Sequence, residues 1–187
     1  MKKLTLEKMK ELESKKLAFF ERYNISENEV IDSIADVLRK KLGFEVKEME
    51  LPQDIDGAIL VDSKGKLTKD NKPIKKIVVS SKIDKLKQRF TVAHEFAHYI
   101  INDNREILAF RDHSRNRKKL FSDNELEDDV DYMAASILMP KDSFYNELIK
   151  LKSEPEVIKY LTLYKKFRVE FHAIFYREQE VEALNNV

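Results

Sequence analysis

The stretch Arg89-Phe90-Thr91-Val92-Ala93-His94-Glu95-Phe96-Ala97-His98-Tyr99-Ile100-Ile101 dominates this sequence. It contains no Pro or Gly, and apolar residues flank its polar centre, so the pattern predicts a helix from about residue 86 to residue 101. On a helix, positions i and i+4 lie about 40° apart around the axis and about 6 Å apart along it. His94 and His98 therefore project from one face, close enough to bind the same metal ion. Glu95 lies beside that face.

The pattern His-Glu-x-x-His on a helix is typical of sites in which two imidazoles hold zinc and the glutamate acts as a general base. His94 and His98 are therefore candidate metal ligands, and Glu95 is the candidate base. The alternative is a helix that carries two histidines by coincidence, because short motifs also match by chance. A third ligand in the right place would favour the metal site.

The composition limits the kind of protein this is. The chain has 187 residues, enough for one domain, with or without a small appendage. Lysine and arginine total 35 against 34 aspartate and glutamate, so the net charge of +1 argues neither for nor against nucleic acid. There is no cysteine, which excludes disulfides and thiolate metal ligands. No apolar run reaches the length of about 18 residues that a membrane span needs, and the charged N-terminus is unlike a secretory signal. We therefore expect a soluble, cytoplasmic protein.

The first half of the chain predicts helices followed by strands. Residues 4–23 and 30–42 have helical periodicity, with Ser26 as a predicted N-cap and Gly43 as a predicted end. The period then changes to that of strands separated by turns, at residues 44–51, 55–62 and 74–80. We expect an α+β fold, in which a small, twisted, mostly antiparallel sheet of about three strands packs on a mainly helical core. A free sheet edge beside the metal helix can pair with an extended peptide.

A second strong helix is predicted from about residue 122 to Pro140. Glu127 and Asp131 stand four residues apart on it, and two alanines further along allow a close approach to a neighbouring helix. These features suit a helix that packs against the metal helix, with one carboxylate on the metal and the other on a ligand histidine. The alternative is a solvated acidic first turn, which the helix dipole favours.

The region between these helices and the C-terminal part of the chain leave alternatives open. Residues 103–122 are polar and basic and predict a loop, with at most one helical turn at residues 107–110. Such a cluster is solvated surface, or it contacts an acidic substrate segment or nucleic acid. The last two predicted helices, joined near residues 167–170, are either a packed pair or a helix-turn-helix. We divide the chain into an N-terminal helical extension, a core and a helical C-terminal subdomain, at residues 1–27, 28–140 and 141–187.

Two blocks of sequence resemble the ImmA/IrrE family of zinc metallopeptidases. The first is residues 87–100, preceded by Ile77-Val78-Val79-Ser80-Ser81, and the second is the helix that ends in Ala134-Ala135-Ser136-Ile137-Leu138-Met139-Pro140. The tail at residues 164–177 is also similar to that family. The resemblance covers roughly residues 28–180.

This resemblance implies a role for each candidate residue. His94 and His98 match the metal-binding histidines of the family, and Glu95 matches its general base. Glu127 matches the acidic third ligand, and Asp131 matches a residue that orients a ligand histidine. The acidic neighbours that compete with Glu127 for the metal are Glu125, Asp128 and Asp129.

The resemblance also implies Zn²⁺ as the cofactor and an endopeptidase activity. The expected substrate is a regulatory protein, commonly a helix-turn-helix repressor of mobile-element or stress genes, cleaved by zinc-activated water with Glu95 as base. One alternative is a non-proteolytic regulatory protein on this scaffold with a protein or DNA partner, and another is a structural zinc domain. Glu95 favours the enzyme, because a scaffold needs no base. A second oxyanion donor is expected, with candidates close in sequence at Tyr99, His113 and Tyr132.

Overall fold

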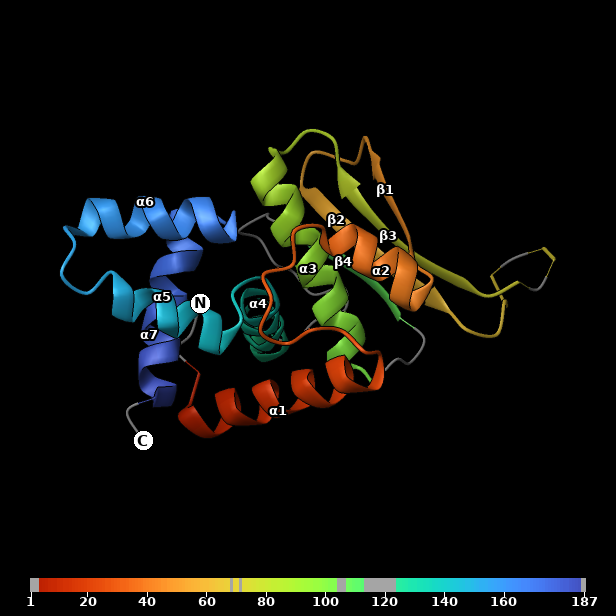
Figure 1. The fold of residues 1–187 in the computed structure, drawn as a ribbon. Helices are drawn as coiled ribbons and strands as arrows, with labels where there is room; N and C mark the ends of the chain where they lie inside the picture. Colours follow the sequence, from red (N-terminus) through yellow and green to blue (C-terminus); the bar gives the residue numbers. More distant parts are fainter. Residues whose placement is uncertain (1–3, 68, 71, 104–106, 113–123, 186–187) are drawn as a thin grey trace.

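The computed structural model describes residues 4–67, 69–70, 72–103, 107–112 and 124–185, and of residues 107–112, 124 and 125 it describes the backbone. The elements, in chain order, are α1 (Leu6–Arg22), α2 (Ile34–Leu42), β1 (Glu45–Met49), β2 (Ile55–Asp62), β3 (Ile74–Ser80), α3 (Lys85–Ile101), β4 (Ile107–Asp112), α4 (Asn124–Leu138), α5 (Lys141–Lys150), α6 (Glu156–Phe167) and α7 (Phe171–Asn185) (Figure 1). The predicted α+β class with helices at the C-terminal end is confirmed.

The sheet has the strand order β1-β3-β2-β4. β2 runs antiparallel to both β3 and β4, whereas β1 runs parallel to β3. The sheet is thus mostly antiparallel, as predicted, and has one strand more than the three expected. The loop and helical turn predicted at residues 107–110 are wrong, because this segment forms β4 along β2, with Leu108 opposite Leu60 and Phe110 opposite Ala58. Pairing with a distant strand decides the conformation here, and a segment this short has no periodicity that would reveal it.

Capping residues set the helix ends. α2 begins after Ser33, whose hydroxyl accepts a hydrogen bond from the backbone N–H of Asp36 at 3.2 Å. The helix start predicted at Ser26 is therefore wrong. Gly43 ends α2 in the left-handed region, at φ 71°, as predicted. α3 begins after Asp84, whose carboxylate accepts hydrogen bonds from two backbone N–H groups of the first turn.

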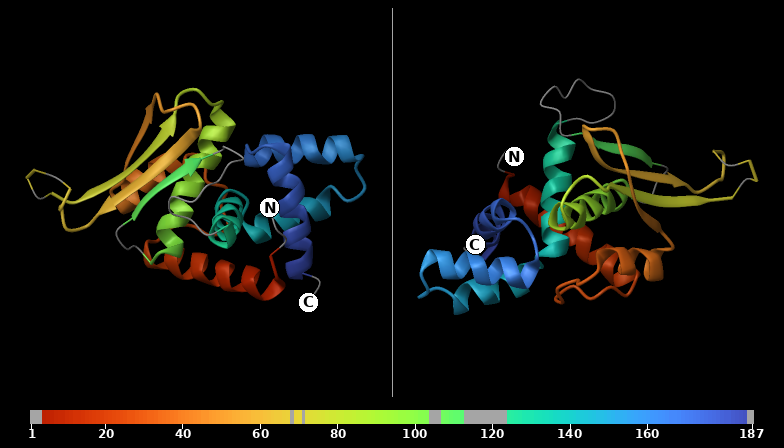
Figure 2. Two further views of the ribbon diagram at one scale, coloured as in Figure 1. Left: turned by 180° about the vertical axis from the view of Figure 1, so that it is seen from behind. Right: turned by 90° about the horizontal axis from the view of Figure 1, so that it is seen from above.

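α3 lies in the middle of the molecule, between the sheet and the helices α1 and α4 (Figures 1 and 2). Every side chain from Thr91 to Ile100 is buried. Phe96 packs edge-on against Phe19 of α1 with ring centroids 5.6 Å apart, and Tyr99 packs edge-on against Phe44 at 5.0 Å. A helix buried on all sides can hold polar groups inside the protein at fixed positions.

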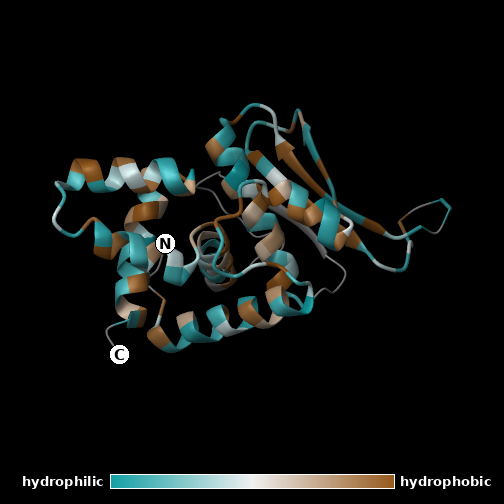
Figure 3. Cartoon of the chain, viewed as in Figure 1, coloured by the Kyte–Doolittle hydropathy of each residue, from teal (hydrophilic) through white to brown (hydrophobic). Residues whose placement is uncertain are grey.

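The C-terminal helices pack on one another and on the core. α7 contacts α5 and α6 and also reaches α1 and α4. Hydrophobic and hydrophilic residues alternate along α1 (Figure 3). Its buried side chains include Met9, Leu12 and Phe20. The division of the chain at residues 27 and 140 stays a prediction. Within the described ranges, no helix combines the length and the hydropathy that crossing a bilayer requires.

Candidate metal centre

His94, Glu95 and His98 lie on the buried middle of α3. Their exposed fractions are 2%, 0% and 4%. The two imidazole rings are 5.0 Å apart between centroids and almost perpendicular, at 76°. The spacing of four residues therefore places both rings on one face of the helix, as predicted.

α4 brings a carboxylate to these rings. Glu127 Oε2 lies 3.3 Å from His94 Nε2, and Glu127 Oε1 lies 3.6 Å from His98 Nε2. One atom from each of the three residues lies within 4.8 Å of the others. In a tetrahedral zinc site with bonds of about 2.1 Å, neighbouring ligand atoms are about 3.4 Å apart. The spacing and chemistry of these donors fit a zinc-sized divalent cation, and three ligands leave a fourth position for water or substrate.

Asp131 lies one helical turn after Glu127 and contacts the other side of the first histidine. Its Oδ1 is 2.8 Å from His94 Nδ1. A carboxylate at Nδ1 favours the tautomer in which Nδ1–H donates to Asp131, so that Nε2 keeps its lone pair for a metal. The structure thus brings the four residues His94, His98, Glu127 and Asp131 into one cluster.

The acidic neighbours of Glu127 do not all face this cluster. Asp129 Oδ2 pairs with Lys8 Nζ of α1 at 3.2 Å, on another side of α4. Two residues along a helix correspond to a rotation of about 200°, so Glu127 and Asp129 cannot share one face. The side chain of Glu125 lies outside the described residues.

A β-bulge brings strand β2 close to Glu95. Ile55 pairs with Asp112 and Gly57 with Arg111, so that Asp56 is an extra residue on β2. A Cβ on Gly57 would lie 2.4 Å from Thr91 Cγ2 and 3.4 Å from Glu95 Oε1. Gly57 is therefore required by the close approach of β2 to the helix face that carries Thr91 and Glu95.

The bulge also directs Asp56 toward the same helix. Successive residues of a regular strand point to opposite faces, yet Asp56 Oδ2 is 3.0 Å from Lys87 Nζ, also on α3. Sequence reasoning did not single out Asp56, Gly57 or Thr91. The available signal was a glycine inside a predicted strand, which indicates a bulge or a close backbone approach.

The three candidates for a second oxyanion donor have different outcomes. Tyr99 lies in the aromatic core beside Phe44, and the hydroxyl of Tyr132 donates to Glu13 Oε1 at 3.0 Å. Both phenols are therefore engaged away from the cluster. His113 lies outside the described residues.

A buried ionic network lies behind α4. Arg177 of α7, fully buried, donates through Nη2 to Glu13 Oε1 of α1 at 2.8 Å and through Nε to the carbonyl oxygen of Met139 at 3.0 Å. Lys16 Nζ lies 2.5 Å from Glu13 Oε2. Burial alone would raise the pKa of Glu13, but the charges of Arg177 and Lys16 lower it to about 2. The network joins α1, α4 and α7, and nothing in the sequence pattern had indicated it.

Fold and cluster together are those of a metallopeptidase-like domain. The chain belongs to the Peptidase_M78 family, the IrrE N-terminal-like domain, whose family model matches residues 39–178. The resemblance inferred from the two sequence blocks is thereby confirmed. A comparison with curated proteins finds no match.

One similar solved structure is a Mycobacterium tuberculosis transcriptional regulator, with a TM-score of 0.52 and 14% sequence identity. The similarity covers 90% of this chain and 46% of the other, so the chain spans less than half the length of that regulator. At this identity the similarity concerns the fold.

Proposed function

We propose that this protein is a zinc-dependent endopeptidase that cleaves a regulatory protein, with a helix-turn-helix repressor as the substrate class. The observation that carries the proposal is the cluster in which His94, His98 and Glu127 lie within 4.8 Å of one another. Glu95 is fully buried on the same helix, and a structural metal site would not need this residue. Because the proposed substrate acts on DNA in the cytoplasm, we place the protein there too.

In this proposal each residue of the cluster has a separate task. His94, His98 and Glu127 would hold the zinc ion, which when bound would polarise a carbonyl group and lower the pKa of a water molecule towards about 7. Glu95 accepts a proton from the attacking water and donates it to the leaving amine. Asp131 holds the ring of His94 in the orientation and tautomer that metal binding needs.

The sheet offers a place for an extended substrate. β4 ends the strand order, so one of its edges has no partner strand among the described residues. β4 also contacts α3, the helix that carries the cluster. A peptide added along that edge would run beside the metal helix, with backbone hydrogen bonds providing affinity.

Replacement of Glu95 by Gln tests the enzyme. The purified Glu95→Gln variant should retain one metal ion per chain and lose cleavage of a helix-turn-helix repressor that the unmodified chain cleaves, because Gln cannot accept the proton. Asp129→Asn is the matched control, since Asp129 pairs with Lys8, and it should cleave as the unmodified chain does. Cleavage by Glu95→Gln at the unmodified rate would exclude this mechanism.

A non-proteolytic regulator is the second candidate, and the similarity to a protein named a transcriptional regulator favours it. In that case the zinc-loaded protein would bind the repressor, or DNA, without cleaving anything. An experiment that mixes the protein with the repressor distinguishes the two functions. The mass of the repressor reports cleavage, and its association with the protein reports binding. Direct DNA binding would weaken steeply with added salt.

A further inference from the structure

Exposed hydrophobic side chains are concentrated on the last two helices. Six of the ten large hydrophobic residues that are exposed in the described part of the chain lie on α6 and α7. They are Val157, Ile158, Leu161, Phe171, Phe175 and Tyr176. Their exposed fractions run from 38% to 69%, which corresponds to roughly 600 Å² of exposed surface at about 200 Å² per large residue. Together they reach the upper end of what monomeric proteins expose as one patch, and patches of this size often serve as interaction surfaces.

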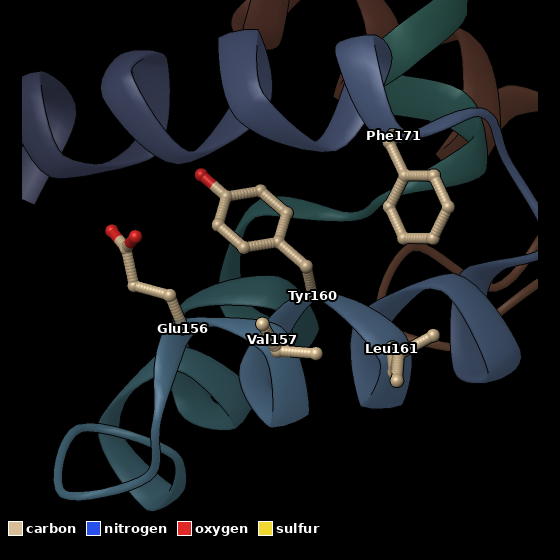
Figure 4. Close-up of a pocket in the computed structure, with 5 residues that line it drawn as sticks. All are labelled: Glu156, Val157, Tyr160, Leu161 and Phe171. Atoms are coloured by element: carbon tan, nitrogen blue, oxygen red, sulfur yellow. The ribbon is translucent and has the colours of Figure 1, made fainter.

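Part of this patch is a shallow, open pocket of about 350 Å³ between the two helices (Figure 4). Its lining residues are Glu156, Val157, Tyr160, Leu161 and Phe171. Two contacts hold its walls in place: the hydroxyl of Tyr160 donates to Glu178 of α7 at 2.8 Å, and Tyr164 stacks on Phe171 with ring centroids 4.9 Å apart. The open pocket therefore presents a mainly apolar surface whose walls are fixed by these contacts.

The charges at the two ends of α6 are opposite. Glu154 and Glu156 stand at its N-terminal end, and Lys165 and Arg168 stand at its C-terminal end. The hydrophobic residues lie between these hydrophilic ends (Figure 3). At helical spacing, residues 157, 158, 161 and 165 share one face. The exposed face of α6 is therefore apolar and then basic, and Glu154, which precedes the helix, adds a negative charge at its N-terminal end.

This face is complementary to itself under two-fold symmetry. If α6 packs antiparallel to α6 of a second copy, Ile158 faces Leu161 of the other chain and Glu154 faces Lys165, and each pair occurs twice. We propose that the face formed by α6 and α7 binds a second copy of this chain, giving a symmetric dimer.

The charge pattern favours a second copy over a foreign protein, because in this register Glu154 of each chain faces Lys165 of the other. The apolar patch supplies most of the roughly 800 Å² that each partner of a standard interface buries, and the charged ends supply the remainder. The proposal does not depend on the peptidase activity.

Sedimentation velocity over a concentration series in the micromolar range tests the dimer. The unmodified chain should sediment as a dimer, and Leu161→Glu should raise the dimer dissociation constant by roughly tenfold or more, because it buries a charge at the centre of the interface. Leu67→Glu is the matched control. Leu67 is 67% exposed and lies on the connection between β2 and β3, so this variant should remain dimeric.

Charge reversal tests the antiparallel register. Glu154→Lys alone and Lys165→Glu alone should each weaken the dimer, because like charges then face each other, and the double variant should restore it. A chain that is monomeric at every concentration would overturn the proposal, as would a dimer unaffected by Leu161→Glu. A strictly monomeric chain that binds the repressor through this face would assign the patch to the repressor instead.

Discussion

The orientation of one imidazole decides whether a metal can bind at this centre. His94 has to present an unprotonated Nε2 towards Glu127, which lies 3.3 Å away. The hydrogen bond between Nδ1 and Asp131 at 2.8 Å fixes both the tautomer and the ring. Without this hydrogen bond, the ring can rotate, and the tautomer with its lone pair on Nδ1 can form. The ring must then be reoriented before a metal can bind, which lowers the affinity for the metal.

Removing Asp131 should therefore weaken metal binding even though Asp131 is not a ligand. We expect Asp131→Ala to lower zinc affinity by about 10–100-fold, the usual cost of losing a carboxylate that holds a ligand histidine. Competition with a chromophoric chelator measures this loss. Asp129→Ala is the control and should change the affinity little, because Asp129 contacts Lys8. Equal losses in the two variants would show that overall charge, and not the hydrogen bond, is responsible.

At the scale of single residues, the sequence predicted the α3 side of the cluster better than the α4 side. The spacing of His94 and His98 fixes their common face on any helix. The choice among the acidic residues at positions 125, 127, 128 and 129 depends on how α4 is rotated against α3. Tertiary packing sets that rotation, and in this fold it directs Asp129 to Lys8 and Glu127 to the histidines.

Among the elements, strand β2 has the most specific effect on the centre. Its bulge at Asp56 sets Gly57 directly over Thr91 on α3, and a Cβ there would lie 2.4 Å from Thr91 Cγ2 and 3.1 Å from the carbonyl oxygen of Val78. Real atoms do not approach so closely, so a side chain at this position would have to move β2 or α3. The close packing of the metal helix against β2 therefore depends on the absence of a Cβ at residue 57.

A methyl group at Gly57 should consequently disturb Glu95 more than it disturbs the histidines. We expect Gly57→Ala to unfold at lower urea concentration, with a loss of about 1–3 kcal/mol, and to lose peptidase rate while keeping its metal. The double variant Gly57→Ala/Thr91→Ser removes the clashing Cγ2 and should recover part of both losses. Equal behaviour of the single and double variants would mean that Thr91 is not the obstacle.

The observed element boundaries agree with the predicted ones where the sequence carries a local signal. They differ where pairing with a distant segment determines the structure. Gly43 ends α2 because the residue after the helix adopts the left-handed backbone conformation, which glycine accepts readily. Two serines were available to begin α2, and the hydrogen bond from Asp36 to Ser33 selects the later one. β4 had no local signal, because its conformation comes from pairing with β2.

At the scale of the whole molecule, buried charged residues of α1 and α7 contact α4. Glu13 of α1 and Arg177 of α7 meet beside Tyr132 of α4, and Lys16 caps the other Glu13 oxygen. Sequence patterns place lysine and arginine at the surface, so the burial of Lys16 and Arg177 was not foreseeable. The network crosses both predicted domain boundaries and links helices that lie more than a hundred residues apart in the sequence.

Removing the central carboxylate should destabilise the fold strongly. Glu13→Gln leaves the buried charges of Arg177 and Lys16 without their main counter-ion, and we expect a loss of about 3–5 kcal/mol in the free energy of unfolding. Urea denaturation at neutral pH measures it. Glu11→Gln on the exposed side of the same helix should change stability by less than about 1 kcal/mol. A similar small change for Glu13→Gln would mean that the network contributes no stability.

Glu180 should give the same network a pH dependence. It lies 3.3 Å from Arg177, and burial raises its pKa from 4.5 to about 7 although the charge of Arg177 lowers it. The folded state therefore holds a proton that the unfolded state releases, and this contribution to stability is complete below about pH 4.5 and is lost as the pH rises towards 7.

Glu180→Gln mimics the protonated side chain at every pH, so a comparison of the two proteins isolates this group. Relative to the unmodified chain, the variant should gain stability between pH 5 and pH 8, by at most about 3 kcal/mol, and the difference should be constant at lower pH. Urea denaturation across this range measures the difference, with Glu182→Gln on the same helix as the exposed control. A difference that stays constant from pH 5 to pH 8 would mean that Glu180 is ionised throughout and that the buried cluster holds two carboxylates against Arg177 and Lys16.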